Sequence, residues 1–207
     1  MGPPRIAAVV LAAGGSTRLG EPKQLVSLGC QPVLAHVLET VRDASVDERF
    51  VVLGHEILAV QQSVDSSGFQ VIENPEYALG QSTSVVAAVG HMPEDIGAII
   101  FVLGDQPLQS LTVIDRIANS WRADPAQIIQ PEYQEGPGNP VLFDRKLFSS
   151  LLELTGDTGA RPILKANRDM IRRVDCTDYN RPLDVDTRED VEQLRAVWSE
   201  RSGACDV

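Results

Sequence analysis

The chain has 207 residues, of which 43% are hydrophobic and 23% are charged, and its formal net charge is −11. This length and composition are typical of one globular domain with a full hydrophobic core, so we treat residues 1–207 as a single domain. The acidic balance argues against nucleic-acid binding, because proteins that bind nucleic acids neutralise the phosphates with lysine and arginine.

The first predicted element is a buried strand at residues 6–11, and a glycine-rich stretch follows it. Residues 10–23 read V-L-A-A-G-G-S-T-R-L-G-E-P-K. Backbone N–H groups freed by glycine, with cations close by, suit a polyphosphate, and a helix starting near Thr17 would add its dipole. The stretch is not a Walker A loop, because Glu21 stands where that motif needs lysine, and it also lacks G-x-G-x-x-G. An ordinary strand-to-helix turn is the alternative.

Strands and helices alternate along the rest of the chain. This alternation predicts a three-layer α/β/α sandwich with a mainly parallel, Rossmann-like sheet, whose ligands lie beyond the carboxyl ends of the strands. Residues 134–140 are a candidate mobile loop, and residues from about 200 to 207 are expected to fray. The predicted strands are 6–11, 50–53, 69–72, 97–103, 128–129 and 141–143, and the predicted helices are 32–41, 82–91, 111–121, 146–154, 162–167 and 190–199.

Cysteines and histidines indicate neither a zinc site nor a disulfide framework. The three cysteines are far apart and odd in number, so we expect free thiols. His36, His55 and His91 form no H-x-x-x-H pair, and we expect them on the surface or in helix packing. No signal peptide is visible and no apolar run reaches the length of about 18 residues that a membrane span requires. We therefore expect a cytoplasmic protein without membrane contact.

Acidic residues near the expected strand ends are candidate metal ligands. Asp105 directly follows the apolar strand 97–103, and Mg²⁺ is usually held by one or two carboxylates together with substrate phosphates. A helix cap or a turn before Pro107 is the alternative role for Asp105. Asp184 and Asp186 share one face by their period of two, and their spacing does not choose between them.

Four segments resemble one family. Residues 10–23 resemble the signature L-A-A-G-x-S-x-R-x-G-x-x-K of the MobA-like nucleotidyltransferases, and within that group the molybdenum cofactor cytidylyltransferases. The resemblance continues at residues 103–107 (L-G-D-Q-P), 156–161 (G-D-T-G-A-R) and 183–187 (L-D-V-D-T). These segments occur in family order and span nearly the whole chain. The resemblance implies a fold of the nucleotide-diphospho-sugar transferase type.

The family resemblance also implies the reaction, which is Mg²⁺-dependent transfer of CMP from CTP, or of another nucleotide from its triphosphate, with release of pyrophosphate. Arg18 is implied to bind the β- and γ-phosphates, and Lys23 to neutralise charge at the α-phosphate. Asp105 and Asp186 are the implied Mg²⁺ ligands. The residues expected at the nucleotide are Leu11, Ala12, Ala13, Gly14, Gly15, Ser16, Arg18, Lys23, Gly80, Gln81, Ser84 and Asp105.

The implied acceptor is molybdopterin or another phosphorylated small molecule, and CTP is favoured because GTP-using relatives have glycine where this chain has Ala13. Arg161 is expected to bind the terminal phosphate of the acceptor, or instead to pair with Asp157. Asn139 stands where the family commonly has histidine. This departure counts against a pterin acceptor more than against nucleotide transfer. The residues expected at the acceptor are Gln106, Asn139, Asp157 and Arg161.

Two alternatives remain beside this reading. In the first, the chain would be a nucleotidyltransferase for a sugar or polyol phosphate. In the second, it would be a non-catalytic carrier that hands the cofactor to a molybdenum hydroxylase. A complete set of Arg18, Lys23, Asp105 and Asp186 counts against a pure carrier, which has no need of it.

Overall fold

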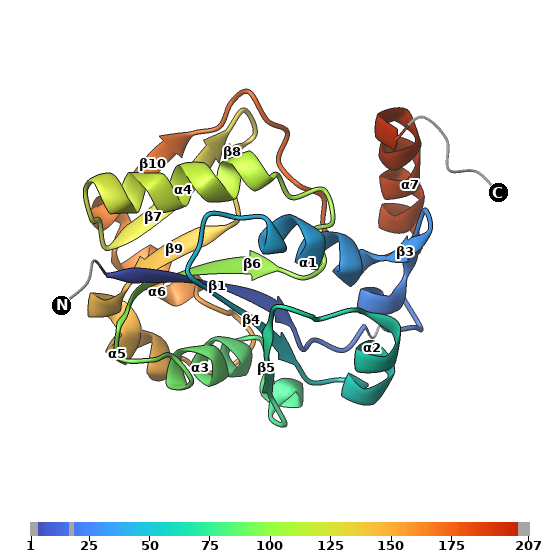
Figure 1. Cartoon of the computed structure of the whole chain (residues 1–207), viewed down its shortest axis with the longest axis horizontal. Helices are drawn as coiled ribbons and strands as arrows, with labels where there is room; N and C mark the ends of the chain where they lie inside the picture. Colours follow the sequence, from blue (N-terminus) through green and yellow to red (C-terminus); the bar gives the residue numbers. More distant parts are fainter. Residues whose placement is uncertain (1–3, 17–18, 203–207) are drawn as a thin grey trace.

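A computed structural model describes residues 4–16 and 19–202, and they form a central sheet with helices on both faces (Figure 1). The strands of this sheet are β1 (Arg5–Ala12), β4 (Glu48–Leu53), β5 (Gln70–Glu73), β6 (Ile96–Leu103), β7 (Ile128–Tyr133), β8 (Gly136–Pro137), β9 (Val141–Asp144) and β10 (Ile171–Asp175). Their order is β10-β7-β9-β6-β1-β4-β5, with β8 paired to β7. Strands β1, β4, β5 and β6 run parallel, and β9 runs antiparallel to both of its neighbours.

Two helical layers enclose the sheet. The buried side chains of α1, α2 and α4 join one core cluster, and those of α3 and α5 join the cluster on the other face. The α-helices are α1 (Val33–Arg42), α2 (Ile57–Ser63), α3 (Ser82–Gly90), α4 (Leu111–Ala123), α5 (Phe148–Leu152), α6 (Arg161–Ala166) and α7 (Arg188–Ser202). The 3₁₀ helices are η1 (Lys23–Leu25), η2 (Tyr77–Leu79), η3 (Arg145–Leu147) and η4 (Arg168–Met170).

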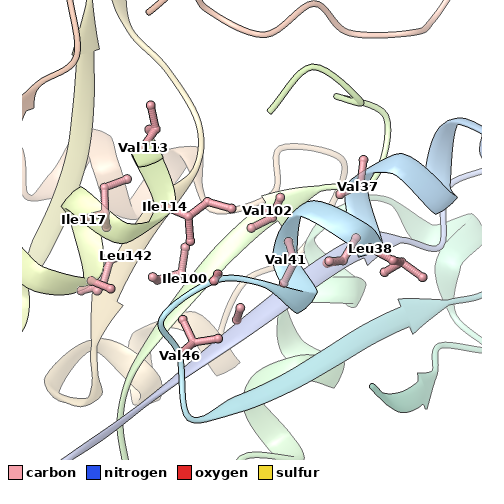
Figure 2. Close-up of a cluster of buried hydrophobic side chains, with 14 of the residues drawn as sticks. Val37, Leu38, Val41, Val46, Ile100, Val102, Val113, Ile114, Ile117 and Leu142 are labelled. Carbon is pink, nitrogen blue, oxygen red and sulfur yellow. The ribbon is translucent and has the colours of Figure 1, made fainter. Parts of the chain in front are cut away.

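Strand β6 shows why a central parallel strand is an unbroken apolar run. Its side chains alternate between the two cores, so Ile100 and Val102 face α1 and α4 while Ile99 and Phe101 face α3. Figure 2 shows Ile100 and Val102 between side chains of α1 and α4, in the layer above the sheet. Because both faces of the strand are covered, polar residues are excluded until the strand ends at Leu103.

The predicted three-layer fold is confirmed, and most differences concern short or polar elements. The structure adds α2, β10 and a hairpin of β2 (Ser27–Leu28) and β3 (Gln31–Pro32), whose sequences are too short or too charged for a periodic signal. The loop at 134–140 folds back through β8, and the predicted helix at 146–154 is a 3₁₀ turn followed by α5. The expected helix start near Thr17 lies outside the described residues, and the first α-helix among the described residues begins at Val33.

Helix α7 packs on the β2–β3 hairpin through a third, smaller core (Figure 1). The ring of Trp198 packs at a tilt of 52° against that of His36, with ring centroids 4.3 Å apart, which confirms the helix-packing role expected for this histidine. Val185, directly before α7, is fully buried in the same core. Helix α7 therefore anchors the segment that carries Asp184 and Asp186. The core consists of Leu19, Val26, Leu28, Val33, Val185, Val191 and Leu194. Among the described residues no helix is both long and apolar enough to span a membrane.

Truncation of Leu194, which is buried in this third core, will loosen α7. We expect Leu194→Ala to lower the free energy of unfolding by about 2–4 kcal/mol, because the change leaves a cavity between α7 and the hairpin. Urea unfolding measures the effect, and Gln193→Ala on the exposed face of α7 is the matched control, expected to stay within about 0.5 kcal/mol. Equal small effects in both variants would show that α7 contributes little to stability.

Candidate active site

The glycine-rich loop and the Asp105 loop leave the sheet side by side. Leu11 of β1 is paired with Leu103 of β6 in parallel register, so both strands end at the same edge. The backbone N–H of Gly104 donates to the carbonyl of Leu11 over 2.9 Å. A Cβ at Gly104 would lie 2.8 Å from that of Ala12, so only glycine allows this approach. The structure thus brings the two predicted loops together at the carboxyl edge, where open α/β sheets bind ligands.

Gln24 holds the glycine-rich loop from inside the protein. Its buried side-chain amide donates to the carbonyls of Ala12 (2.7 Å) and Gly14 (2.9 Å). The backbone N–H of His55 donates to the carbonyl between them, that of Ala13, over 3.1 Å. The carbonyls of residues 11–14 therefore all have partners. The partners lie on both sides of β1, with Gly104 after β6 and His55 after β4, so the backbone path of the loop is held from two directions.

A glycine-rich loop at the carboxyl edge of a parallel sheet suits a polyphosphate, because its backbone N–H groups can form an anion-binding concavity. Ser16 closes the loop by accepting a hydrogen bond from the backbone N–H of Lys23 over 2.7 Å. The sequence analysis did not identify Gln24 as a residue that holds the loop. Its one sequence signal is an amide side chain directly after Lys23, at the start of a short apolar run. Arg18, the residue predicted to bind the β- and γ-phosphates, lies outside the described residues.

Lys23 joins the two predicted metal ligands. Its ammonium forms an ion pair with Oδ2 of Asp105 and a second with Oδ1 of Asp186 at 3.1 Å. Asp105 comes from the end of β6, and Asp186 from the segment before α7. Asp184, the alternative ligand, does not take part in these ion pairs, since its Oδ1 accepts a hydrogen bond from Gln106 over 2.7 Å. The structure therefore selects Asp186 as the carboxylate that faces Asp105 across one cation.

Burial gives this cluster its electrostatic character. Burial raises the pKa of Asp105, and the Lys23 ammonium opposes that shift without cancelling it. Burial also disfavours the charged form of Lys23, but Asp105 and Asp186 outweigh this effect and raise the pKa of Lys23. The lysine therefore stays protonated. A buried carboxylate whose pKa remains raised beside an ammonium is stabilised further by additional positive charge.

The residues present fit a divalent cation that is shared with a substrate. Oδ1 of Asp105 is buried and has no hydrogen-bond partner in the described part of the chain. The contacts with Lys23 show that Asp105 and Asp186 reach a common point. The described residues contain no group of three or more His, Cys, Asp or Glu side chains that could hold a metal. Two carboxylates are nevertheless sufficient for Mg²⁺, which usually completes its shell with phosphates and water.

The second predicted nucleotide segment, at the start of α3, is held from two sides. Asn74 is buried at the end of β5, and its amide donates to the hydroxyls of Thr83 (2.9 Å) and Ser84 (3.0 Å). On the other side Ser82 donates through its hydroxyl to the carbonyl of Thr155 over 3.1 Å. A Cβ at Gly80, where φ is +119°, would lie 2.5 Å from a backbone oxygen of residue 156, so this position requires glycine.

The predicted acceptor residues lie at the same edge in different environments. Asp157 is exposed and accepts a hydrogen bond from the backbone N–H of Gln81 over 3.0 Å. No ion pair between Asp157 and Arg161 occurs among the described residues, so the alternative pairing of these two was wrong, and Arg161 is exposed at the start of α6. Asn139 is half-buried and precedes β9, whose Val141 pairs with Phe101, so it lies toward the Asp105 end of β6.

His55 and Ala13 differ from what their sequence context indicates. The ring of His55 lies against Gly15 and makes an edge contact with Tyr77 at 5.6 Å between centroids, so His55 belongs to the site rather than to helix packing. Ala13 is buried, and its methyl lies 3.0 Å from where a Cβ of Gly54 would stand. This methyl group packs in the core and does not line an open slot.

The chain is similar to known proteins over nearly its whole length. The model of the MobA-like NTP transferase domain matches residues 8–171. Nicotine blue oxidoreductase of Paenarthrobacter nicotinovorans is 29% identical over 202 residues, which cover 92% of this chain and 97% of that protein.

Solved structures give the same result. The homologue of Mycobacterium tuberculosis Rv0371c from Mycobacterium sp. strain JC1 is 35% identical with a TM-score of 0.88, covering 95% of this chain and 98% of that one. Rv0371c of M. tuberculosis in complex with manganese is 30% identical with a TM-score of 0.78, covering 93% and 98%. A CMP-2-keto-3-deoxy-manno-octonic acid synthetase, 16% identical with a TM-score of 0.76 over 95% of this chain and 99% of that one, shares the fold of the nucleotide-diphospho-sugar transferase type.

Removal of the Gln24 amide will weaken nucleotide binding. Gln24→Met keeps the side-chain length but removes both donors to the loop carbonyls, so we expect nucleoside triphosphate affinity to fall about tenfold or more. Titration calorimetry with CTP and Mg²⁺ measures the change. Gln62→Met, on the exposed surface of α2, is the control and will bind as the unaltered protein does. Unchanged affinity in Gln24→Met would mean that the loop does not depend on this amide.

Proposed function

Because the chain belongs to the MobA-like NTP transferase family, we propose that it transfers CMP from CTP to a phosphorylated acceptor. A phosphate oxygen of the acceptor attacks the α-phosphorus of CTP. The bond from the α-phosphorus to the oxygen that bridges it to the β-phosphate breaks, and pyrophosphate leaves. Such a reaction requires positioning and charge neutralisation and no covalent intermediate on the enzyme.

One observation carries this proposal, namely that Lys23 and two carboxylates meet beside the glycine-rich loop. Lys23 lies next to the loop, because its backbone N–H donates a hydrogen bond to the hydroxyl of Ser16. A phosphate chain held by the N–H groups of the loop would therefore lie next to the ammonium of Lys23. That ammonium would neutralise charge that develops at the α-phosphate.

Asp105 and Asp186 are proposed to hold Mg²⁺. The cation would supply a positive charge that binds phosphate oxygens and stabilises the charge developing on them. The manganese complex of the Rv0371c protein, 30% identical to this chain, supports a divalent metal. Oδ1 of Asp105 is the buried oxygen best suited to this role, because it lacks a hydrogen-bond partner within the described residues.

The nucleotide is proposed to lie between the glycine-rich loop and the start of α3. Residues 11–16 would hold the phosphates together with Arg18, and the segment with Gly80, Gln81 and Ser84 would contact the ribose and base. Gln81 is the exposed member of that segment, whereas Ser84 is buried and bonded to Asn74. The choice of CTP rests on the resemblance at Ala13, where GTP-using relatives have glycine.

Molybdopterin is the proposed acceptor, with a molybdenum hydroxylase as the recipient of the product. Arg161 supports this proposal because it is an exposed guanidinium outside any ion pair in the described chain, two residues after Gly159, which lies beside Gln81. Asn139 lies toward the Asp105 end of β6. Asp157 contributes indirectly, by holding Gln81.

Pyrophosphate release tests the reaction directly. CTP, GTP, ATP and UTP are compared with Mg²⁺, each with and without molybdopterin, and we expect release only with CTP and molybdopterin. GTP preference would keep the reaction and overturn the base. Release only with a sugar or polyol phosphate would replace the acceptor, and CTP binding without any release would favour a carrier.

Loss of either carboxylate will abolish most of the activity. We expect Asp105→Asn and Asp186→Asn each to lower kcat at least about a hundredfold. Each change removes a carboxylate that is proposed to hold the divalent cation beside the phosphates. Asp169→Asn, an exposed change away from the site, is the charge-matched control and will retain full turnover. Normal turnover of Asp105→Asn would refute the metal assignment.

A second candidate function is oxidoreductase activity, favoured by the match to nicotine blue oxidoreductase over 97% of that protein. Such a reaction would require a soluble hydride donor, for which NADH and NADPH are the probes, although the glycine-rich loop lacks the G-x-G-x-x-G of the usual dinucleotide-binding turn. Absorbance of NADH or NADPH with nicotine blue tests this. Oxidation of the dinucleotide, without pyrophosphate release from any triphosphate, would establish the second candidate over the first.

A further inference from the structure

Gln106 is a buried polar residue next to the candidate metal ligand Asp105. Only 3% of its surface is exposed, although it follows the end of a strand. Its side-chain amide donates to Oδ1 of Asp184 over 2.7 Å, a bond that spans 78 positions of the chain. A bond from an amide to a carboxylate is charge-assisted and stronger than one between neutral groups.

A second bond runs beside the first. The backbone carbonyl of Asp105 accepts a hydrogen bond from the N–H of Val185 over 3.1 Å. Asp105 and Gln106, which follow β6, are thus hydrogen-bonded to Val185 and Asp184, which precede α7. This pair of bonds, together with the buried side chain of Val185, sets the register between the two segments.

Asp186 depends on this register. Its side chain is 44% exposed, so packing alone does not hold it, and its backbone N–H is bonded within its own segment to Asp190 over 3.1 Å. Gln106 makes a side-chain hydrogen bond that ties this segment to the Asp105 loop, beside the packing of Leu108 on the core that contains Val185. A shift of one residue would turn Asp186 away from Lys23, because neighbouring residues in an extended segment face opposite sides.

We propose that Gln106 is a positioning residue that holds Asp184 and thereby sets Asp186 opposite Asp105. The role deepens the proposed function and rests on it, since the two carboxylates are proposed there to hold a divalent cation. The acceptor contact expected for Gln106 from the sequence is the competing role, and the test below distinguishes the two. Outer partners of metal ligands act in this way in many sites, by fixing ligand orientation.

The test compares two variants of equal net charge. Gln106→Met removes the donor and keeps the side-chain length, while the swap Q106E/D184N keeps one hydrogen bond with donor and acceptor reversed. Mn²⁺ binding is measured by electron paramagnetic resonance on the full chain. We expect Gln106→Met to weaken binding about 10- to 100-fold and the swap to restore it to within about threefold of the unaltered protein.

Activity and hydrogen exchange supply independent readouts. In Gln106→Met the metal concentration for half-maximal activity will rise while the KM of the acceptor stays unchanged, and amide exchange in residues 183–187 will become faster. In the swap both readouts will return toward those of the unaltered protein. Thermal unfolding confirms that each variant folds.

The outcomes separate the two proposals. Unweakened Mn²⁺ binding in Gln106→Met, or equal weakening in Gln106→Met and the swap, overturns the positioning role and leaves the proposed function intact. A raised acceptor KM with normal Mn²⁺ binding overturns it in favour of an acceptor contact. An unaltered protein that neither binds Mn²⁺ nor releases pyrophosphate overturns the proposed function, and the role of Gln106 with it.

Discussion

The candidate site depends on the ammonium of Lys23, where three distant parts of the chain meet. Lys23 follows the glycine-rich loop after β1, Asp105 ends β6, and Asp186 precedes α7. Two carboxylates held this close, one of them largely buried, repel each other unless positive charge lies between them. Positive charge is therefore stabilising at this edge of the sheet, where a phosphate chain would be bound. Lys23 supplies one such charge, and Oδ1 of Asp105, which has no hydrogen-bond partner among the described residues, is the oxygen proposed to bind a second cation.

Each of the three groups is held by a different kind of structure. Asp105 is placed by the rigid central sheet, whose strand β6 is covered on both faces. Lys23 is placed by a loop with little regular structure, which Gln24 and the backbone of His55 hold through its carbonyls. Asp186 is placed by a small separate core under α7 and by the bonds of the Asp105–Gln106 pair to Asp184 and Val185. Of the three side chains, Asp105 is the least exposed and Asp186 the most exposed.

Much of the site was predictable because its residues lie in contiguous motifs. The loop at 10–23 and Asp105 stand at the ends of apolar strands, and parallel strands that are neighbours must end at one edge. Gln24 and Gln106 were not assigned these holding roles, since their partners lie elsewhere in the chain. The choice of Asp186 over Asp184 needed either a family resemblance or the structure, because both share one face of the same segment.

The sequence by itself determined the layered α/β fold, the position of the glycine-rich loop and the identity of the charged groups, because these depend on local periodicity and on residue type. Only the tertiary structure decided that Gln106 engages Asp184, that Asp157 holds the start of α3, and that Ala13 is buried. Such contacts join residues tens of positions apart. They follow from the register of strands and the docking of α7, which no local pattern encodes.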